Sequence, residues 1–447
     1  MKRKISILIL VMLMLPLAFF LGGCIFDSKD DNDNTKPETV EILPQSISLN
    51  QTELNLIKNE TFTLIATILP NDATNKTVTW LSSSPSVATV NNGLITAVNV
   101  GQTTITAQTS NNKTQTCVVN VSEEIDYYTG SDIYYYEIET DNNQDYCVIT
   151  GLKNNNYKNL EIPSKIDSYD VLGIGYYAFG EEDIENVKIP NSVTTIGDTA
   201  FGMCSSLTRV TIGSGVTSIG SGVFVGCDSL TSITIDSNND KYYCVNKCLI
   251  EKTTNTLLFC YGNEIPSNVT TIGEGAFAYC KNLTSITIPN SVINIGRQAF
   301  NGCTNLTNII IPNSVTAIGE SAFSGCTNLK SVTIQKGVKS IGDFVFSGCT
   351  NLESVTIGEG VTSIGESAFS GCANLKSVTI EEGVTSIGIY AFSSCGNLTS
   401  ITIPNSVISM GKKVFYNWTP QQTINCRTSS KPEGWSSDWN SGCSANI

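Results

Sequence analysis

The feature that most constrains the fold is a cysteine that returns at a fixed interval through the second half of the chain. Six of the seven intervals between these cysteines are 23 residues long, and the remaining interval is 53 residues. The cysteines are Cys204, Cys227, Cys280, Cys303, Cys326, Cys349, Cys372 and Cys395. A fixed period of this length is typical of a solenoid, in which each short repeat buries its apolar face only against its neighbours.

One copy of the repeat, residues 303–325, reads CTNLTNIIIPNSVTAIGESAFSG. Leu306, Ile309 and Ile311 have the spacing of side chains that point inward from one strand. Phe323 is expected to fill the interior from a short helical turn, in a column of phenylalanines that stack in one row. The column has ten members: Phe179, Phe201, Phe224, Phe277, Phe300, Phe323, Phe346, Phe369, Phe392 and Phe415. The sequence therefore predicts a solenoid of about ten 23-residue turns, made of strands and short helical turns.

This repeat resembles the BspA-type leucine-rich repeat, and the resemblance runs from about residue 146 to the end of the chain. It implies a surface-exposed protein associated with adhesion to host proteins, other bacteria or matrix, and it names no particular ligand. We place the solenoid at 157–422, with an insertion at 236–264 that resembles a hairpin common in this family. Residues 423–447 resemble the family's C-terminal cap, and 123–156 are interpreted as a junction and an N-terminal cap.

Short alternating runs of apolar and polar residues between turn signals fill residues 38–122. This pattern predicts an antiparallel sandwich of about seven strands, with Trp80 as a core anchor. The stretch VTWLSSSPSVATVNNGLITAVNVGQTTITA, residues 78–107, resembles the bacterial immunoglobulin-like domain of group 2. That resemblance implies a non-catalytic module used as a spacer or in adhesion. The whole chain is thus predicted to be multidomain and mainly β.

The N-terminus predicts export and a lipid anchor. Three basic residues at 2–4 precede an apolar run over 5–21, which has the form of a signal peptide. The run ends in Leu-Gly-Gly before Cys24, which resembles the bacterial lipobox, whose thiol carries a diacylglycerol. We therefore expect a lipoprotein signal peptide at 1–23, an acidic flexible tether at 24–37, and an extracellular protein anchored at the cell surface. An uncleaved anchor helix is the alternative, but the run is short for a span.

Composition excludes several classes of function. The chain has 26 basic and 40 acidic residues and a formal net charge of −14, which argues against nucleic-acid binding. It has no histidine, so the usual general base of an enzyme is missing, and no nucleophile motif is present. Cys244, Cys248 and Cys260 are one ligand short of a structural zinc site. We expect no enzyme activity, no metal and no cofactor.

The sequence leaves the state of the cysteines open. Adjacent repeat cysteines would lie about 5 Å apart, which permits disulfide bonds. A column of small buried thiols is the simpler interpretation, because a free cysteine packs as a small apolar residue. Cys426 and Cys443, near the C-terminus, are the better candidates for a disulfide.

The predicted binding surface is the outward face of the repeat strands, where side chains alternate with the buried ones. Its residues are Ser285, Thr287, Asn308, Ile310, Ser331, Thr333, Ser354, Thr356, Ser377, Thr379, Ser400 and Thr402. Serine and threonine also suit any exposed strand, and the residues that dominate binding sites, Trp, Tyr and Arg, are absent from this set. Five tyrosines between positions 127 and 136 form an alternative contact patch, although packing at the junction explains them equally simply: Tyr127, Tyr128, Tyr134, Tyr135 and Tyr136.

These observations favour a binding or adhesion module for host or bacterial surface proteins or glycans. A passive structural or antigenic coat protein is the first alternative. A surface glycan hydrolase is the second, and it would need two facing carboxylates that the sequence does not nominate. The oligomeric state stays open.

Overall fold

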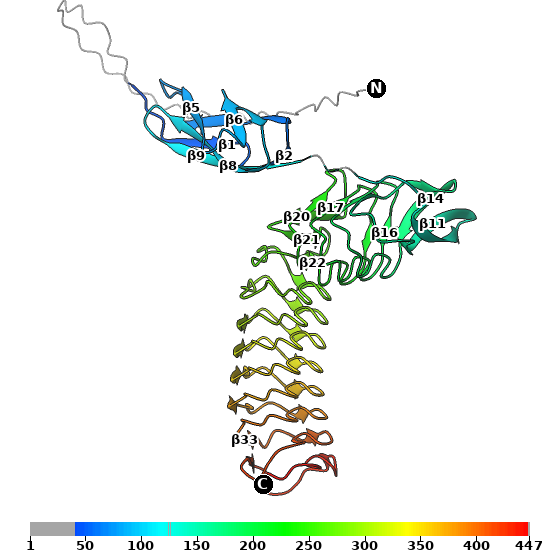
Figure 1. Cartoon of the computed structure of the whole chain (residues 1–447). Helices are drawn as coiled ribbons and strands as arrows, with labels where there is room; N and C mark the ends of the chain where they lie inside the picture. The colour runs from blue at the N-terminus through cyan, green and yellow to red at the C-terminus, as the bar shows by residue number, and fades with distance from the viewer. Residues whose placement is uncertain (1–40, 124, 126, 446–447) are drawn as a thin grey trace, which may run out of the picture. The chain divides into compact units, whose positions relative to one another are not determined.

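The chain forms two units, Met1–Glu124 and Ile125–Ile447, in a computed structural model that describes residues 41–445 apart from 124 and 126. Figure 1 shows both units built from strands and turns. No α-helix occurs in these described ranges, and accordingly none has the length and apolar character to cross a membrane. The predicted signal peptide at 1–23, Cys24 and the tether at 24–37 lie outside the described residues.

The first unit is a sandwich of short strands. The sheets are ordered β2-β9-β8-β5 and β3-β7-β6, with β1 and β4 as a separate pair. Their bounds are β1 (Ser46–Leu49), β2 (Glu53–Ile57), β3 (Thr61–Thr63), β4 (Ala66–Leu69), β5 (Val78–Ser82), β6 (Ala88–Asn91), β7 (Leu94–Ala97), β8 (Gly101–Thr109) and β9 (Thr114–Ser122). The strands number nine within residues 41–123, rather than about seven, because the pair β1 and β4 is added to the seven strands of the two larger sheets. Trp80 is half-buried and packs against the core.

The second unit is a solenoid with two stacks of parallel strands, visible as the regular turns coloured green to red in Figure 1. One stack carries the predicted binding surface, and we call its members the face strands. They are β12 (Asn159–Glu161), β15 (Asn186–Ile189), β17 (Arg209–Ile212), β19 (Ser232–Ile235), β25 (Asn308–Ile311), β27 (Ser331–Ile334), β29 (Ser354–Thr356), β31 (Ser377–Val378), β33 (Ser400–Ile403) and β35 (Thr423–Cys426). Neighbouring face strands pair mostly with an offset of 23 residues, as in Asn308 with Ser331 and Ser331 with Ser354.

The other stack runs along the flank of the solenoid, and we call its members the flank strands. They are β11 (Gln144–Leu152), β14 (Tyr169–Ile174), β16 (Thr195–Ile196), β18 (Ser218–Ile219), β22 (Thr256–Cys260), β23 (Thr271–Ile272), β24 (Asn294–Ile295), β26 (Ala317–Ile318), β28 (Ser340–Ile341), β30 (Ser363–Ile364), β32 (Ser386–Ile387), β34 (Ser409–Met410) and β36 (Gly434–Trp435). These 13 parallel strands mark about 13 turns within the described residues. The phenylalanine column predicts only about ten, because the turns of β11, β22 and β36 do not carry its motif.

The ten phenylalanines lie in one row inside the solenoid, as the repeat predicts. From Phe277 to Phe415 each ring is stacked on the next, with ring centroids 4.8 to 6.1 Å apart. The row is interrupted at the insertion, where Phe259 meets Phe224 edge to face at 5.5 Å. Edge-on aromatic contacts close both ends, with Tyr134 against Phe179 and Trp439 against Phe415. No single repeat could bury such a ring alone, so the row holds the turns together.

The predicted helical turns at the phenylalanine corners are absent from the described residues. In one repeat Ser321 and Gly325 adopt left-handed backbone conformations, with φ of 55° and 70°. The backbone N–H of Phe323 between them donates to the carbonyl of Val345 in the next turn, at 2.9 Å. The corner is therefore tied to its neighbouring turn, which satisfies amides that a helix would satisfy internally.

The segment predicted as an insertion forms an antiparallel meander of β20 (Tyr242–Val245), β21 (Cys248–Glu251) and β22. Strand β22 also pairs in parallel with β23, so the meander supplies one turn of the stack. Leu249 and Phe259 belong to the core on its N-terminal side, whereas Ile250 and Leu257 belong to the core on its C-terminal side. The meander thus joins two apolar cores.

All eight repeat cysteines are free thiols; Cys280 is half-buried, and each of the seven buried ones donates a hydrogen bond to a phenylalanine carbonyl of the preceding turn. Cys326 reaches the carbonyl of Phe300 at 3.2 Å, and Cys349 reaches that of Phe323 at the same distance. Cys204, Cys227, Cys303, Cys372 and Cys395 make the equivalent bond. In the next turn Trp418 replaces the cysteine, and its indole N–H donates to the carbonyl of Phe392 at 2.8 Å.

The expected pairing of Cys426 with Cys443 is wrong, since both are free thiols. Cys426 ends the face strand β35, whereas Cys443 follows the last aromatic corner, so the two belong to different sides of a turn. The disulfide found in the described part of the chain joins Cys248 and Cys260 instead. These residues lie directly opposite each other in the antiparallel pair β21 and β22, with Cα atoms 4.1 Å apart.

Candidate ligand-binding surfaces

The strand alternation sets the chemistry of the solenoid's outer face. On β25, Ile309 and Ile311 point into the core, and Asn308 and Ile310 point outward. All twelve residues of the predicted surface are exposed or half-buried. Ile310, with 61% of its surface exposed, is the largest apolar group among them.

Register brings the central members of this set into columns. Asn308, Ser331, Ser354 and Ser377 follow one another across the paired strands, and Ile310, Thr333 and Thr356 form the adjacent column. The Ser331 hydroxyl donates to the Asn308 side-chain oxygen at 2.7 Å. Ser400 and Thr402 lie on β33, which pairs with β35, whereas Thr287 makes an isolated bridge to Glu264. The set is therefore one central sheet with a smaller group at either end.

A ladder of asparagine amides borders this face. Each side-chain N–H₂ donates to the side-chain oxygen of the asparagine one turn earlier, at 2.9 to 3.4 Å, through Asn305, Asn328, Asn351, Asn374 and Asn397. Because these bonds occupy much of the amides' capacity, the ladder stabilises the stack. The face itself offers mainly hydroxyl groups to a partner.

The N-terminal end of the same face has a different chemistry. The outward residues there include Glu161 on β12, Lys188 on β15 and Arg209 on β17. The Lys188 ammonium lies 3.7 Å from the Glu161 carboxylate and 3.9 Å from the centre of the Tyr127 ring. Burial raises the pKa of Tyr127, with Arg209 acting in the opposite direction. These charged residues lie outside the predicted binding surface, although extending the 23-residue register upstream of Cys227 identifies Arg209.

The tyrosine-rich segment divides between core and surface. Tyr134 is fully buried, and burial raises its pKa well above the usual range. Tyr135, one residue along β10 (Tyr134–Asp141), is 56% exposed. Tyr128 packs on Tyr157 with ring centroids 4.2 Å apart, and both line a cleft of about 440 Å³. The structure therefore assigns only part of the segment to packing.

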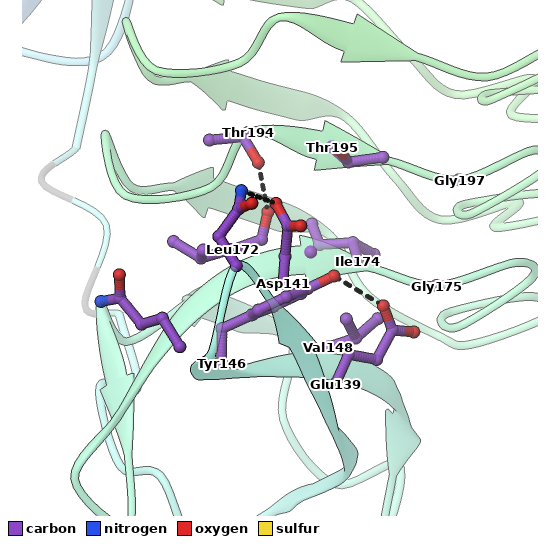
Figure 2. A pocket seen from close by; sticks show the side chains of 13 residues that line it. Glu139, Asp141, Tyr146, Val148, Leu172, Ile174, Gly175, Thr194, Thr195 and Gly197 are labelled. Carbon is purple, nitrogen blue, oxygen red and sulfur yellow. Dashed lines mark hydrogen bonds between the residues drawn. The ribbon is translucent and has the colours of Figure 1, made fainter.

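A second hollow, of about 540 Å³, lies between the tip of the β10–β11 hairpin and the flank strands β14 and β16 (Figure 2). Glu139, Asp141 and Tyr146 come from the hairpin, and the backbone around Gly173 and Gly175 supplies much of the other side. No lysine or arginine is among its lining residues. The hollow is consequently electronegative.

Both carboxylates of this hollow already have partners. The Tyr146 hydroxyl donates to Glu139 at 2.8 Å, and this hydrogen bond raises the pKa of Tyr146. The Asn142 amide donates to Asp141 at 3.1 Å. A glycoside hydrolase needs two carboxyl groups that face the sugar from either side of the scissile bond, whereas each carboxylate here accepts a hydrogen bond from a neighbouring side chain of its own hairpin. The geometry therefore gives little support to hydrolysis.

Comparison with family models agrees with this two-part architecture. A model described as BspA type leucine rich repeat region, in six copies, matches residues 150–256, 261–360 and 339–434. The model of the bacterial Ig-like domain (group 2) matches residues 44–119. The first model alone covers more than half of the chain.

Individual relatives match parts of the chain. An uncharacterized protein of Clostridium acetobutylicum is 36% identical over 125 residues, which are 27% of this chain and 12% of that protein. Another from the same organism is 48% identical over 77 residues, which are 17% of this chain and 19% of that protein. The chain thus spans less than a fifth of the length of either relative. The crystal structure of a leucine-rich repeat protein from Eubacterium ventriosum is 30% identical, covers 62% of this chain and 77% of its own, and superimposes with a TM-score of 0.53.

Proposed function

Because the chain belongs to the family of BspA-type leucine-rich-repeat proteins, we propose that it is a cell-surface binding module that attaches the cell to host or bacterial surface proteins or glycans. The observation that supports this role is the register of the face strands. It repeats outward side chains at about 4.8 Å intervals over many turns and leaves the apolar side chains inside. A broad and regular surface of this kind suits a large partner.

The chemistry of the face favours many weak contacts over one tight site. Hydroxyl groups bind through hydrogen bonds that replace bonds to water, and each contributes little net free energy. Many copies on one cell would raise the overall strength of attachment. A lipid on Cys24, with the Ig-like unit as a non-catalytic spacer, would hold the solenoid outside the cell. We propose this anchoring from the sequence alone, because Cys24 lies outside the described residues.

Attachment of cells that display the full chain tests the proposal. The test variant carries Thr356→Glu and Thr379→Glu on the face, and the matched control carries Ala317→Glu and Ser409→Glu on exposed flank-strand positions. Both pairs add the same charge to the outside of the solenoid. We expect attachment to matrix proteins or neighbouring bacteria to fall for the face variant and to be unchanged for the control.

A passive coat is the competing function. It would be supported if wild-type cells attached to matrix proteins, glycans and other bacteria no better than cells displaying the chain without residues 303–394. Equal attachment by the face variant and wild type would reject the face as the contact surface.

A further inference from the structure

The cleft at the N-terminal end of the solenoid has the chemistry of a carbohydrate site. Eight residues line it: Tyr127, Tyr128, Thr129, Gly130, Asn156, Tyr157, Lys158 and Asn159. Three are tyrosines, and all three are half-buried, so part of each ring is open to solvent. A volume of about 440 Å³ is within the range of small-ligand sites, roughly 300 to 1,000 Å³.

Backbone pairing holds the two segments of the cleft in place. The N–H of Tyr128 donates to the carbonyl of Asn159 at 2.9 Å, and the N–H of Glu161 donates to the carbonyl of Tyr128 at 2.9 Å. This parallel bridge adds the segment around Tyr128 to the edge of β12. The cleft is therefore continuous with the face strands, and its shape is set by a sheet instead of by a free loop.

Side-chain contacts fix the rings as well. Tyr128 packs against Tyr157, and its hydroxyl donates to the Asp132 carboxylate at 2.8 Å. Tyr127 lies beneath the Lys188 ammonium. Rings that are already ordered lose little conformational freedom when a ligand stacks on them. Three fixed and partly open rings are thus a prepared stacking surface.

The two lysines in and next to the cleft are already in ion pairs. Lys158 forms an ion pair with Asp183, and Lys188 pairs with Glu161. No carboxylate is among the lining residues in the described part of the chain, which omits residue 126. The groups left to meet a ligand are aromatic faces, the Thr129 hydroxyl and the Asn156 amide, which has no side-chain hydrogen-bond partner within the described chain. This set matches a neutral sugar ring, which combines an apolar face of C–H groups with peripheral hydroxyls.

We infer that this cleft binds a neutral glycan by stacking a pyranose ring on its tyrosines, with the Asn156 amide and Thr129 hydroxyl bonding the sugar hydroxyls. The inference rests on the proposed binding function, because it assigns a ligand class to one end of the same face. An anionic glycan fits less well, since both nearby ammonium groups have carboxylate partners.

An oligosaccharide array probed with the full chain, followed by calorimetry with the tightest neutral oligosaccharide, tests this site. We expect Tyr157→Ala and Tyr127→Ala each to weaken binding by about tenfold or more, because each removes a stacking face. Tyr157→Phe keeps the ring and should bind nearly as well as wild type. Tyr135→Ala is the matched control, since Tyr135 is an exposed tyrosine that does not line the cleft. Thermal unfolding of each variant verifies that the fold is intact.

Three binding results would overturn the inference: the wild type binds no neutral sugar, it binds only acidic sugars, or both alanine variants keep the affinity of the wild type. A fourth result would also overturn it, namely that the alanine variants lose attachment to a protein that carries no glycan. Its failure is distinguishable from failure of the proposed function, because attachment that depends on Thr356 and Thr379 would survive the first three results.

Discussion

The repeated cysteine shows how one side chain can serve a solenoid. Its thiol is small enough for the space between turns, and it donates a second hydrogen bond to a phenylalanine carbonyl that also accepts a backbone N–H, as the Phe300 carbonyl does from Cys303. Trp418 makes the same bond with an indole N–H where the repeat ends. The repeat cysteines and Trp418 therefore share a buried hydrogen-bond donor at a fixed position of the repeat, because tryptophan makes the same bond with a very different side chain.

Thiol reactivity tests this role. Burial raises the pKa of Cys326 and Cys395 to about 12, so almost no thiolate exists at pH 8. We expect the folded chain to react with an aromatic disulfide reagent, if at all, at the half-buried thiols Cys244, Cys426 and Cys443; Cys280 is also half-buried, but its pKa is raised to about 12. Unfolding without reductant should release the 13 free cysteines found in the described residues. Rapid labelling of Cys349 in the folded state would contradict the account.

The same pKa shifts predict a loss of stability in alkali. A buried thiol keeps its proton in the folded state up to a pH near 12, whereas in the unfolded chain it ionises near its ordinary value of 9.0. The unfolded state is therefore favoured increasingly as the pH rises from 9 toward 12, and the stabilisation is complete below pH 9. Urea unfolding midpoints measured between pH 7 and 11 should fall above pH 9. A midpoint that does not fall there would contradict the assignment of buried free thiols.

Trp418→Phe isolates the hydrogen bond at the end of the column. The ring stays large and apolar, but the Phe392 carbonyl loses its indole donor in a buried setting. We expect the free energy of unfolding to decrease by about 1–3 kcal/mol. Tyr416→Phe is a control on an exposed neighbour, and its effect on the urea midpoint should be small. Equal midpoints for Trp418→Phe and wild type would show that the bond contributes nothing.

Within each strand-and-corner element of the solenoid, glycine occurs for two different reasons. A Cβ on Gly388 would lie 2.4 Å from the backbone of the preceding turn, at Glu366 N and Gly365 C. A Cβ on Gly348 would meet nothing closer than 4.0 Å, but this residue has a φ of +70°. The first glycine is required by close approach and the second by its backbone conformation.

Alanine substitution separates these two requirements. Gly348→Ala should cost roughly 1–2 kcal/mol, the usual penalty for a left-handed non-glycine residue. Gly388→Ala should cost more, because the backbone of two turns must move apart. Thermal unfolding of both variants provides the comparison. A smaller loss for Gly388→Ala than for Gly348→Ala would mean that the turns are not packed as closely as the structure has them.

The features of the solenoid that repeat along the chain can be predicted from the sequence. The phenylalanine row and the outward alternation of Asn308 and Ile310 are predictable, since a period along the chain becomes a period in space. The prediction of helical turns at the corners is wrong. A segment such as ESAFS suits a helix locally, but the N–H of Phe323 bonds to the next turn. The tertiary arrangement decided the conformation there.

Features that occur once were harder to predict. The Cys248–Cys260 bond depends on the antiparallel register of β21 and β22, which no repeat specifies. The cleft depends on residues 127–130 meeting 156–159, as in the bond from the Tyr128 N–H to the carbonyl of Asn159, 31 positions further along the chain. Composition pointed to the tyrosines, but only their packing shows which are buried and which line a cleft.

At the scale of the whole molecule, a stack with a constant offset should tolerate loss of one complete turn. Excision of residues 326–348 joins Gly325 to Cys349 and preserves every pairing type on both sides. We expect a folded protein with a modestly lower melting temperature, since stability in repeat proteins is approximately a sum over neighbouring turns.

Excision of 12 residues, 326–337, is the matched control for this deletion. It puts the face strand β25 opposite residues 343–346 of a phenylalanine corner and should abolish cooperative unfolding. Circular dichroism during heating distinguishes the two outcomes. Equal damage by both deletions would contradict a stack held together by nearest-neighbour pairing.

Photo-crosslinking shows whether partners meet the solenoid on its face strands. A photoreactive amino acid is placed either at Thr356 on the face or at Ala317 on the flank, in full-length protein displayed on cells that attach to a matrix protein or glycan-bearing surface. We expect illumination to crosslink the partner at position 356 and to leave position 317 unlinked. Crosslinking at 317 alone would place the contact on the other stack of strands and contradict this expectation.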